Sequence, residues 1–340
     1  DEAGAASEFD GSVKTIGKKE IADVLSKTCK VDALSEADDE DSQQLENLAN
    51  RMLSQIYGQD EAIRQVVESV QMSRAGLSDD DKPLASLLFV GPTGVGKTEV
   101  ARVMSKELGI ALIRFDMSEY TEKHAVAKLI GSPAGYIGYE DGGLLTDAIR
   151  KNPNCVLLLD EIEKAHQDIY NILLQVMDYA RLTDNKGRHA DFRNVVLIMT
   201  SNAGAQFASQ ASIGFNSNVS RGDAMMRQVK KTFKPEFLNR LSGAVVFHDM
   251  DKQMATLILQ KKLRELDSKL EKKQVNLELS FDAFEYILKE GFTTEYGARE
   301  MDRVISQKLK PLLMREILFG SLKKGGNITI DIKDGCLSVR

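Results

Sequence analysis

Residues 87–98 read Leu-Leu-Phe-Val-Gly-Pro-Thr-Gly-Val-Gly-Lys-Thr, a short apolar run that leads directly into a glycine-rich segment. The segment consists of Gly91, Pro92, Thr93, Gly94, Val95, Gly96, Lys97 and Thr98, and it matches the pattern G-x-x-x-x-G-K-[ST] at every fixed position. An apolar strand before it and a helix over 98–108 after it form the context that a phosphate-binding loop requires. Glycines let backbone N–H groups curl around phosphates, while Lys97 supplies an ammonium group and Thr98 a hydroxyl for Mg²⁺. The sequence therefore predicts that this loop holds the phosphates of a nucleotide.

The apolar run before the loop is one of five. The others lie at 111–115, 155–159, 195–199 and 244–247, and helical stretches separate most of them. Short continuous apolar strands that alternate with helices indicate a parallel sheet covered on both faces. Amphipathic helices are expected at 45–56 and 61–74. These patterns predict an α/β fold of the P-loop NTPase class, with a parallel sheet sandwiched by helices.

The pattern changes after Asp249. A long charged helix at 254–273 is followed by helical stretches at 281–289 and 299–318, and two alternating strands flank Asp334-Gly335 as in a hairpin. We therefore expect a smaller α+β domain at the C-terminal end. The predicted division is a partly disordered N-terminal linker at 1–44, a large ATPase domain at 45–249 and a small domain at 250–340.

Composition limits the class of protein. The chain has 340 residues, is 42% hydrophobic and 28% charged, and carries 45 basic against 51 acidic side chains, a net charge of −6. Such a balance is typical of a soluble globular protein and argues against nucleic-acid binding by bulk charge. No apolar run approaches the roughly 18 residues of a membrane span. Three scattered cysteines and four histidines without ligand spacing favour neither disulfides nor a zinc site, which fits a reducing, cytoplasmic setting.

A second motif follows the apolar run at 155–159, where Asp160 and Glu161 end the strand. Phosphoryl transfer to water needs a carboxylate near Mg²⁺ and a group that orients the attacking water. Asp160 fits the first role and Glu161 the second. Together with the phosphate loop, these residues predict that the chain binds ATP or ADP with Mg²⁺ and hydrolyses ATP.

The two motifs resemble those of the AAA+ ATPases, and the longer pattern from Leu45 to Ile332 resembles the second ATPase module of the Clp/Hsp100 unfoldases, of the ClpA type. The resemblance implies roles for several further residues. Ile56 and Tyr57 match the element beside the adenine, and Asn202 matches a polar sensor of the γ-phosphate or attacking water. Arg240 matches the arginine finger that reaches a neighbouring subunit's nucleotide, and Arg299 matches a second sensor acting in cis.

The resemblance also implies an assembly and its partners. A finger supplied in trans implies a ring, and the family forms homo-hexamers, here in a longer bacterial protein because the chain starts with Asp1 rather than Met. Tyr136 and Ile137 match the pore loop that grips unfolded or tagged protein substrates. Ile213, Gly214 and Phe215 match the loop that binds a ClpP-type peptidase; adaptor proteins are further candidate partners.

Three alternatives remain open at this level. The first is a protease-independent disaggregase of the same family, against which Ile213-Gly214-Phe215 argues. The second is a nucleic-acid remodeller of the AAA+ class, for which a Lys or Arg is expected where Tyr136 stands. The third is a scaffold that binds ATP without hydrolysing it, against which Glu161, Asn202, Arg240 and Arg299 argue.

Overall fold

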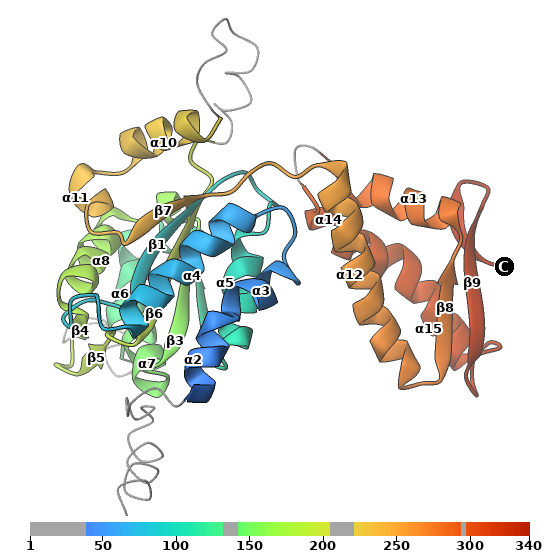
Figure 1. Ribbon diagram of the computed structural model, residues 1–340, viewed down its shortest axis with the longest axis horizontal. Coiled ribbons are helices and arrows are strands. Elements are labelled where there is room, and N and C mark those ends of the chain that lie inside the picture. Colours follow the sequence, from blue (N-terminus) through green and yellow to red (C-terminus); the bar gives the residue numbers. More distant parts are fainter. Residues whose placement is uncertain (1–38, 132–141, 205–220, 294–296) are drawn as a thin grey trace, which may run out of the picture.

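The structure is a computed structural model that describes residues 39–131, 142–204, 221–293 and 297–340. Two parts lie side by side and are connected by the segment that follows strand β7 (Figure 1). The first part is built around a five-stranded sheet, and the second around a three-stranded sheet with a long helix. None of the helices in the described ranges is both long and apolar enough to cross a membrane.

The large sheet is parallel throughout, with strand order β2-β3-β6-β1-β7. Its strands are β1 (Ala85–Val90), β2 (Ala111–Asp116), β3 (Cys155–Asp160), β6 (Val195–Ser201) and β7 (Gly243–Val246). The order places β3 and β1, which carry the two predicted motifs, on either side of β6. All five strands point their carboxyl ends toward one edge of the sheet, where open α/β folds bind ligands.

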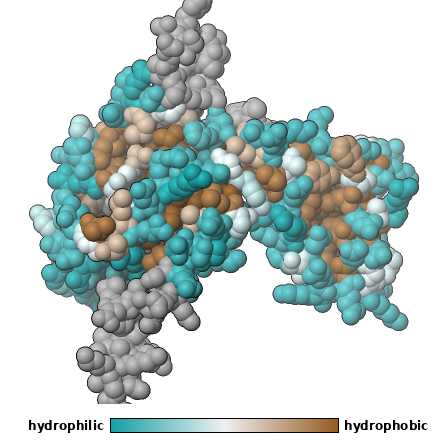
Figure 2. Space-filling view, in the orientation of Figure 1, coloured by the Kyte–Doolittle hydropathy of each residue, from teal (hydrophilic) through white to brown (hydrophobic). Residues whose placement is uncertain are grey.

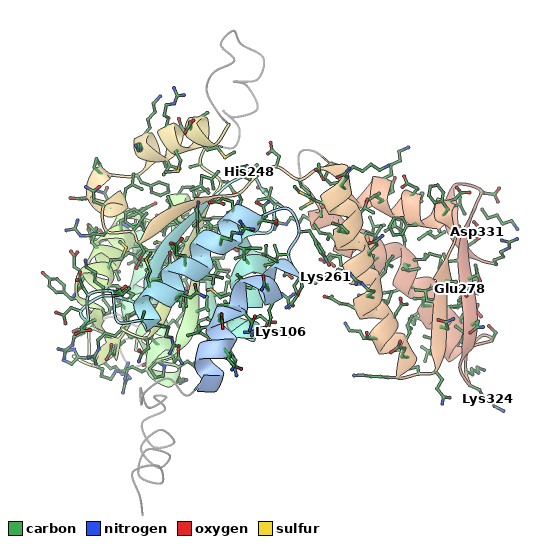
Figure 3. All side chains as sticks on the ribbon, in the orientation of Figure 1. Lys106, His248, Lys261, Glu278, Lys324 and Asp331 are labelled. Carbon is green, nitrogen blue, oxygen red and sulfur yellow. The ribbon has the colours of Figure 1, made fainter. Side chains whose placement is uncertain are left out.

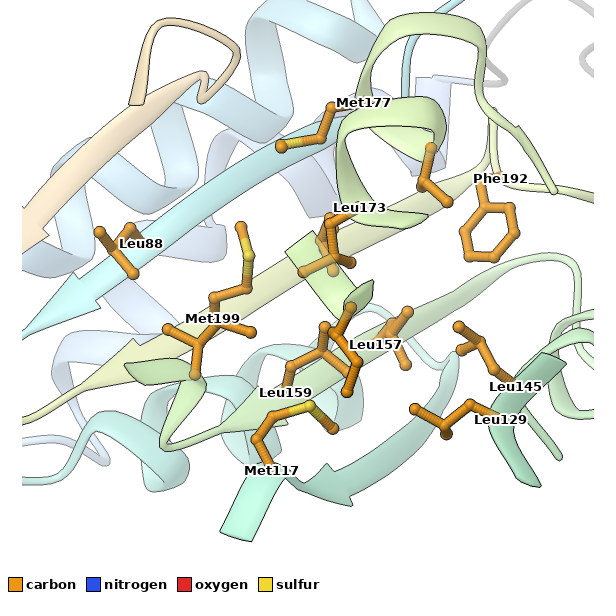
Figure 4. Packing of buried hydrophobic residues seen from close by; sticks show 14 of the residues in the cluster. Leu88, Met117, Leu129, Leu145, Leu157, Leu159, Leu173, Met177, Phe192 and Met199 are labelled. Carbon is orange, nitrogen blue, oxygen red and sulfur yellow. The ribbon is translucent and has the colours of Figure 1, made fainter. Parts of the chain in front are cut away.

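Alternate residues of the three central strands enter two separate cores. Leu88, Leu157 and Met199 face one core, whose packing with α8 (Gln167–Tyr179) is seen in Figure 4. Leu87 and Leu158 face the other core, which α4 (Asp60–Arg74) and α5 (Lys97–Glu107) complete. Because both faces of these strands are covered, their sequences are continuously apolar rather than alternating.

Short elements complete the first part. Beside the second core lie α2 (Asp39–Glu46) and α3 (Leu48–Leu53). Around the first core lie η1 (Met117–Tyr120), α6 (Lys123–Ile130), α7 (Leu144–Lys151), η3 (Ile162–Lys164), α10 (Arg221–Thr232) and α11 (Pro235–Leu238). The antiparallel pair β4 (Arg181–Thr183) and β5 (His189–Asp191) forms a separate hairpin.

The second part has its own core, formed by α12 (Lys252–Glu271), β8 (Val275–Leu279), α13 (Phe281–Gly291), α14 (Arg299–Val304), the π-helix η4 (Ile305–Leu309), α15 (Lys310–Leu318), β9 (Gly326–Lys333) and β10 (Cys336–Val339). Strand β9 pairs in parallel with β8 and antiparallel with β10, which confirms the predicted hairpin. Hydrophobic residues gather over the middle of this part in the view of Figure 2.

Three elements differ from the sequence-based expectations. The helix expected at 45–56 is two helices, α2 and α3, and α2 begins at Asp39. The helix expected at 299–318 is interrupted by η4, next to Pro311, which has no N–H to donate to the preceding turn. Strand β2 was expected to be buried, but it is one of the two edge strands of this sheet and is mostly half-exposed. This exposure brings Arg114 into the functional site.

Candidate active site

The glycine-rich loop connects β1 to α5. Gly94 and Gly96 have φ angles of 80° and 104°, a region that favours glycine because side chains with a Cβ clash there. At Gly91, an added Cβ would lie 2.9 Å from both Cβ and the carbonyl oxygen of Phe247. Helix α5 begins at Lys97, so its free backbone N–H groups and partial positive charge face the loop.

Lys97 is buried beneath this loop, with 7% of its surface exposed. Its Nζ donates hydrogen bonds to the carbonyl oxygens of Gly91 at 2.6 Å and Pro92 at 2.7 Å, and to Oδ1 of Asn202 at 2.8 Å. Burial lowers the pKa of Lys97 from 10.5 to about 8, although Glu163, Asp160 and Glu161 favour the charged form. The ammonium group is therefore held charged at neutral pH, in a place where phosphate can replace its present partners.

Asp160 lies at the carboxyl end of β3 and is buried. Its Oδ1 accepts a hydrogen bond from the hydroxyl of Thr200, and its Oδ2 accepts from the hydroxyl of Thr98 at 3.3 Å. Oδ2 also accepts from Nη2 of Arg114 at 2.7 Å. The carboxylate thus joins the phosphate loop to three neighbouring strands of the sheet.

The oxygen atoms of Thr98 and Asp160 suit Mg²⁺, which prefers hard oxygen ligands. Within the described residues, no group of three or more His, Cys, Asp and Glu side chains could hold a metal ion by itself. This donor set therefore fits a cation that takes few protein ligands and completes its coordination with phosphates and water.

Glu161 follows Asp160 in a left-handed backbone conformation, with φ 57° and ψ 50°. Its N–H donates to the Thr200 hydroxyl at 3.0 Å, so the same hydroxyl positions both acidic residues. Its carboxylate forms an ion pair with Lys164 and accepts a long hydrogen bond of 3.4 Å from Nδ2 of Asn202. The backbone N–H of Asn202 in turn donates to Glu163 at 2.9 Å.

A cavity of about 610 Å³ contains these residues and reaches the second part of the molecule. Its lining includes Ile56, Tyr57, Thr93, Gly94, Val95, Gly96, Lys97, Thr98, Arg114, Asp160, Glu161, Thr200, Asn202 and Arg299. The structure thus gathers most of the predicted nucleotide-site residues, including the one on α14, around one cavity.

Several contacts hold the second part against this cavity. Gly297 is so close to the phosphate loop that an added Cβ would lie 2.7 Å from the carbonyl oxygen of Gly94. Lys261 of α12 donates to the carbonyl oxygen of Gln55 at 3.0 Å and pairs with Glu99 at 3.1 Å, and Figure 3 shows it between the two parts. These contacts allow a nucleotide to touch both parts at once.

Buried Gln59 lies just after Ile56 and Tyr57, the residues predicted to lie beside the adenine, and it bonds to the chain between the two parts. Its Nε2 donates to the carbonyl oxygens of Val95 at 3.3 Å and His248 at 2.9 Å, and its Oε1 accepts from the N–H of His248 at 3.0 Å. The phosphate loop and the connecting segment are therefore bonded to one side chain.

Arg240 is not among the described residues that line the cavity. Its Nε donates to the two carboxylate oxygens of Asp178 at 2.7 and 2.8 Å, and its Nη1 donates to the carbonyl oxygen of Glu236 at 2.8 Å. Tyr136, Ile137, Ile213, Gly214 and Phe215 lie outside the described residues.

Sequence reasoning assigned no role to Arg114 or Thr200. For Thr200, the β3–β6 register aligns Leu159 with Met199 and so brings the next residues, Asp160 and Thr200, together. The register itself, however, becomes known only from the sheet. Arg114 lies in a run that was interpreted as a buried strand.

Comparisons with known proteins agree with this arrangement. Residues 82–244 match the model of the AAA domain (Cdc48 subfamily), and residues 250–330 match that of the C-terminal, D2-small domain of ClpB protein. The chain is 44% identical over 340 residues to the ClpA homolog protein of Fuscovulum blasticum, with 99% of this chain and 43% of that protein covered. It is 43% identical over 305 residues to the negative regulator of genetic competence ClpC/MecB of Bacillus subtilis (strain 168), with 87% and 38% covered.

A solved structure is similar over almost the whole chain. The closed-state cryo-electron-microscopy reconstruction of Hsp104 with ATPγS and FITC casein has a TM-score of 0.81 and 33% sequence identity, with 95% of this chain and 56% of that chain covered. The chain spans less than half the length of the two curated relatives named above. The fold, the cavity and these matches together show that the chain belongs to the Clp/Hsp100 family of AAA+ ATPases and fits the second ATPase module of that family.

Proposed function

We propose that this chain is the ATP-hydrolysing motor of a protein unfoldase, which threads polypeptides through a ring of six copies into a ClpP-type peptidase. The observation that carries the proposal is the division of the predicted site: Lys97, Asp160, Glu161, Asn202 and Arg299 surround one cavity, whereas Arg240 binds Asp178 away from it. A site that lacks its finger in one subunit is completed by a neighbour.

Within one subunit, different residues bind the phosphates, hold the metal ion and orient the attacking water. Lys97 and the loop N–H groups bind the phosphates, and Thr98 and Asp160 would hold Mg²⁺, which neutralises phosphate charge when bound. Glu161 accepts a hydrogen bond from the attacking water and orients it. Asn202 contacts both Lys97 and Glu161, so it can relate the state of the γ-phosphate to the position of that carboxylate.

The position of the second part supports its movement during the ATP cycle. Arg299 lies on α14 and lines the cavity, and Gly297 packs against the phosphate loop. A γ-phosphate that attracts Arg299 would draw the second part toward the sheet, and its loss on hydrolysis would release it. Differential contacts of this kind are what a conformational change requires.

Replacement of Tyr136 by Ala in the full-length protein tests translocation. We expect unfolding of a tagged fluorescent protein to fall at least tenfold, because the aromatic grip is lost, while basal ATP hydrolysis stays within about twofold. Phe281→Ala, which truncates an exposed aromatic side chain on α13 that is not among the described residues lining the cavity, is the control. Hydrolysis stimulated by DNA rather than by unfolded protein would instead support a nucleic-acid remodeller.

Deletion of Ile213-Gly214-Phe215 tests the peptidase partner. Two apolar side chains in a polar stretch are suited to a pocket on a partner protein. We expect the deletion to abolish peptide degradation by an added ClpP-type peptidase and to leave ATP hydrolysis intact. If stimulation of the peptidase persists, the proposal that this loop binds a ClpP-type peptidase is wrong.

The disaggregase alternative has support of its own, because relatives named ClpB match and the second part matches a ClpB model. The chain is 41% identical over 324 residues to chaperone protein ClpB 2 of Synechocystis sp., with 94% of this chain and 37% of that protein covered. Recovery of aggregated luciferase without any peptidase, together with no binding to the peptidase, would favour this function.

A further inference from the structure

Arg114 places a positive charge beside the carboxylate that is proposed to bind Mg²⁺. It lies on edge strand β2, whose parallel register with β3 aligns Asp116 with Asp160. Its guanidinium Nη2 donates to Oδ2 of Asp160 at 2.7 Å. The Arg114 side chain is 50% exposed and lines the cavity, whereas the Asp160 side chain is 11% exposed. The exposed Arg114 side chain has room to change its position, whereas the buried Asp160 side chain does not.

The atom that Arg114 contacts is the one that a metal ion would need. Oδ1 of Asp160 is occupied by the hydroxyl of Thr200, and Oδ2 is the oxygen that faces the hydroxyl of Thr98. A metal ion shared by Thr98 and Asp160 would therefore use the oxygen to which the guanidinium is bonded. A guanidinium and a metal ion bound to the same oxygen would share its negative charge, and two positive charges at that distance repel each other.

Arg114 also interacts electrostatically with a second carboxylate, that of Asp116. Asp116 lies two residues further along β2, so both side chains leave the same face of the strand. Hydrogen bonds from Ser118 lower the pKa of Asp116, and the charge of Arg114 contributes to the same direction. Asp116 lines the same cavity. When Arg114 leaves Asp160, a negative partner remains available.

We propose that Arg114 is an internal counter-cation, which holds Asp160 in the nucleotide-free site and must be displaced when Mg²⁺ binds with the nucleotide. It is a positioning residue that raises the Mg²⁺ concentration needed for tight binding and favours release of the metal with ADP. This inference rests on the proposed metal role of Thr98 and Asp160.

The test is the Mg²⁺ dependence of ADP binding by the module, measured with fluorescent mant-ADP at fixed pH and ionic strength. For Arg114→Gln we expect the half-saturating Mg²⁺ concentration to fall about fivefold, the size expected for a partly exposed ion pair. ADP affinity without Mg²⁺, measured in EDTA, is expected to stay within twofold. Arg114→Lys keeps the charge and is expected to retain most of the wild-type Mg²⁺ requirement.

Arg102→Gln is the matched control. Arg102 lines the same cavity, its side chain is 51% exposed, and it pairs with Glu99 instead of Asp160. Its loss removes one positive charge from the cavity and is expected to leave the Mg²⁺ midpoint unchanged. Equal shifts for Arg114→Gln and Arg102→Gln would overturn the proposal, because the effect would then be general electrostatics.

Two other outcomes would also contradict the proposal. If Arg114→Gln weakens ADP binding in EDTA by more than about threefold, Arg114 contacts the nucleotide directly. If the same variant raises the Mg²⁺ midpoint, Arg114 promotes metal binding instead of opposing it. If wild-type ADP binding does not depend on Mg²⁺, or Asp160→Asn leaves that dependence unchanged, the proposed metal role fails first. These results separate failure of the inference from failure of the function on which it rests.

Discussion

Glu161→Gln is expected to lower ATP turnover by about 10²–10⁴-fold while ATP still binds, since loss of a positioned general base costs about that much. Gln has nearly the same size, but its amide cannot accept a proton from water. The hydrogen bond from the backbone N–H of residue 161 to Thr200 does not depend on the side chain, so the local conformation should survive. The measurements are steady-state phosphate release by the full-length protein and mant-ATP affinity.

Glu119→Gln provides the control, because Glu119 is exposed on η1 and is not among the residues that line the cavity. We expect it to keep wild-type turnover. Wild-type turnover in Glu161→Gln would remove Glu161 from its proposed role. Loss of ATP binding in the same variant would assign it a structural role beside Lys164 and Asn202 instead.

Lys97→Gln is expected to weaken ADP binding by about 30-fold to several thousand-fold, corresponding to the 2–5 kcal/mol typical of removing one member of a buried charged pair. The amide retains a donor for the carbonyl oxygens of Gly91 and Pro92 but carries no charge for the phosphates. Calorimetric titration with ADP is the measurement. Lys106→Gln changes an exposed lysine at the far end of the same helix (Figure 3) and should bind like the wild type.

The pH dependence of ADP binding tests whether the charge of Lys97 is what strengthens that binding. With a pKa of about 8, Lys97 loses its proton as the pH rises above 8, whereas bound phosphates favour the charged form. ADP affinity should therefore fall between pH 8 and 10, and ADP binding at pH 9 should take up protons that binding at pH 7 does not. Titrations in buffers of different ionisation enthalpy measure this uptake, which Lys97→Gln should lack.

The same pKa has a consequence for folding. Because Lys97 has a lower pKa in the folded chain than the unfolded value of 10.5, the unfolded chain binds more protons between about pH 8 and 10.5. The contribution of Lys97 to the free energy of unfolding of the nucleotide-free module therefore rises with pH in this window. Denaturant unfolding at several pH values measures this contribution. If the free energy of unfolding of Lys97→Gln rose with pH in this window as much as that of the wild type, Lys97 would not be the group responsible.

Much of the fold could be predicted because its signals are local. The loop at 91–98 specifies its own conformation through glycines at 94 and 96, which adopt left-handed angles. The central strands are recognisable because burial on both faces makes them continuously apolar. Edge strand β2 has a similar composition but different exposure, and sequence patterns do not distinguish these cases reliably when the run is only six residues long.

The sequence by itself determined the phosphate loop, the acidic pair at 160–161, the change to a second folding unit and the membership of a family, since each depends on neighbouring residues or on similarity along the chain. Only the tertiary structure decided that Arg114 meets Asp160, that Thr200 bonds both acidic residues and that Gly297 touches the phosphate loop. These contacts join residues 39 or more positions apart. They depend on the strand order β2-β3-β6-β1-β7 and its register, which the packing of the two cores selects and no single stretch of sequence encodes.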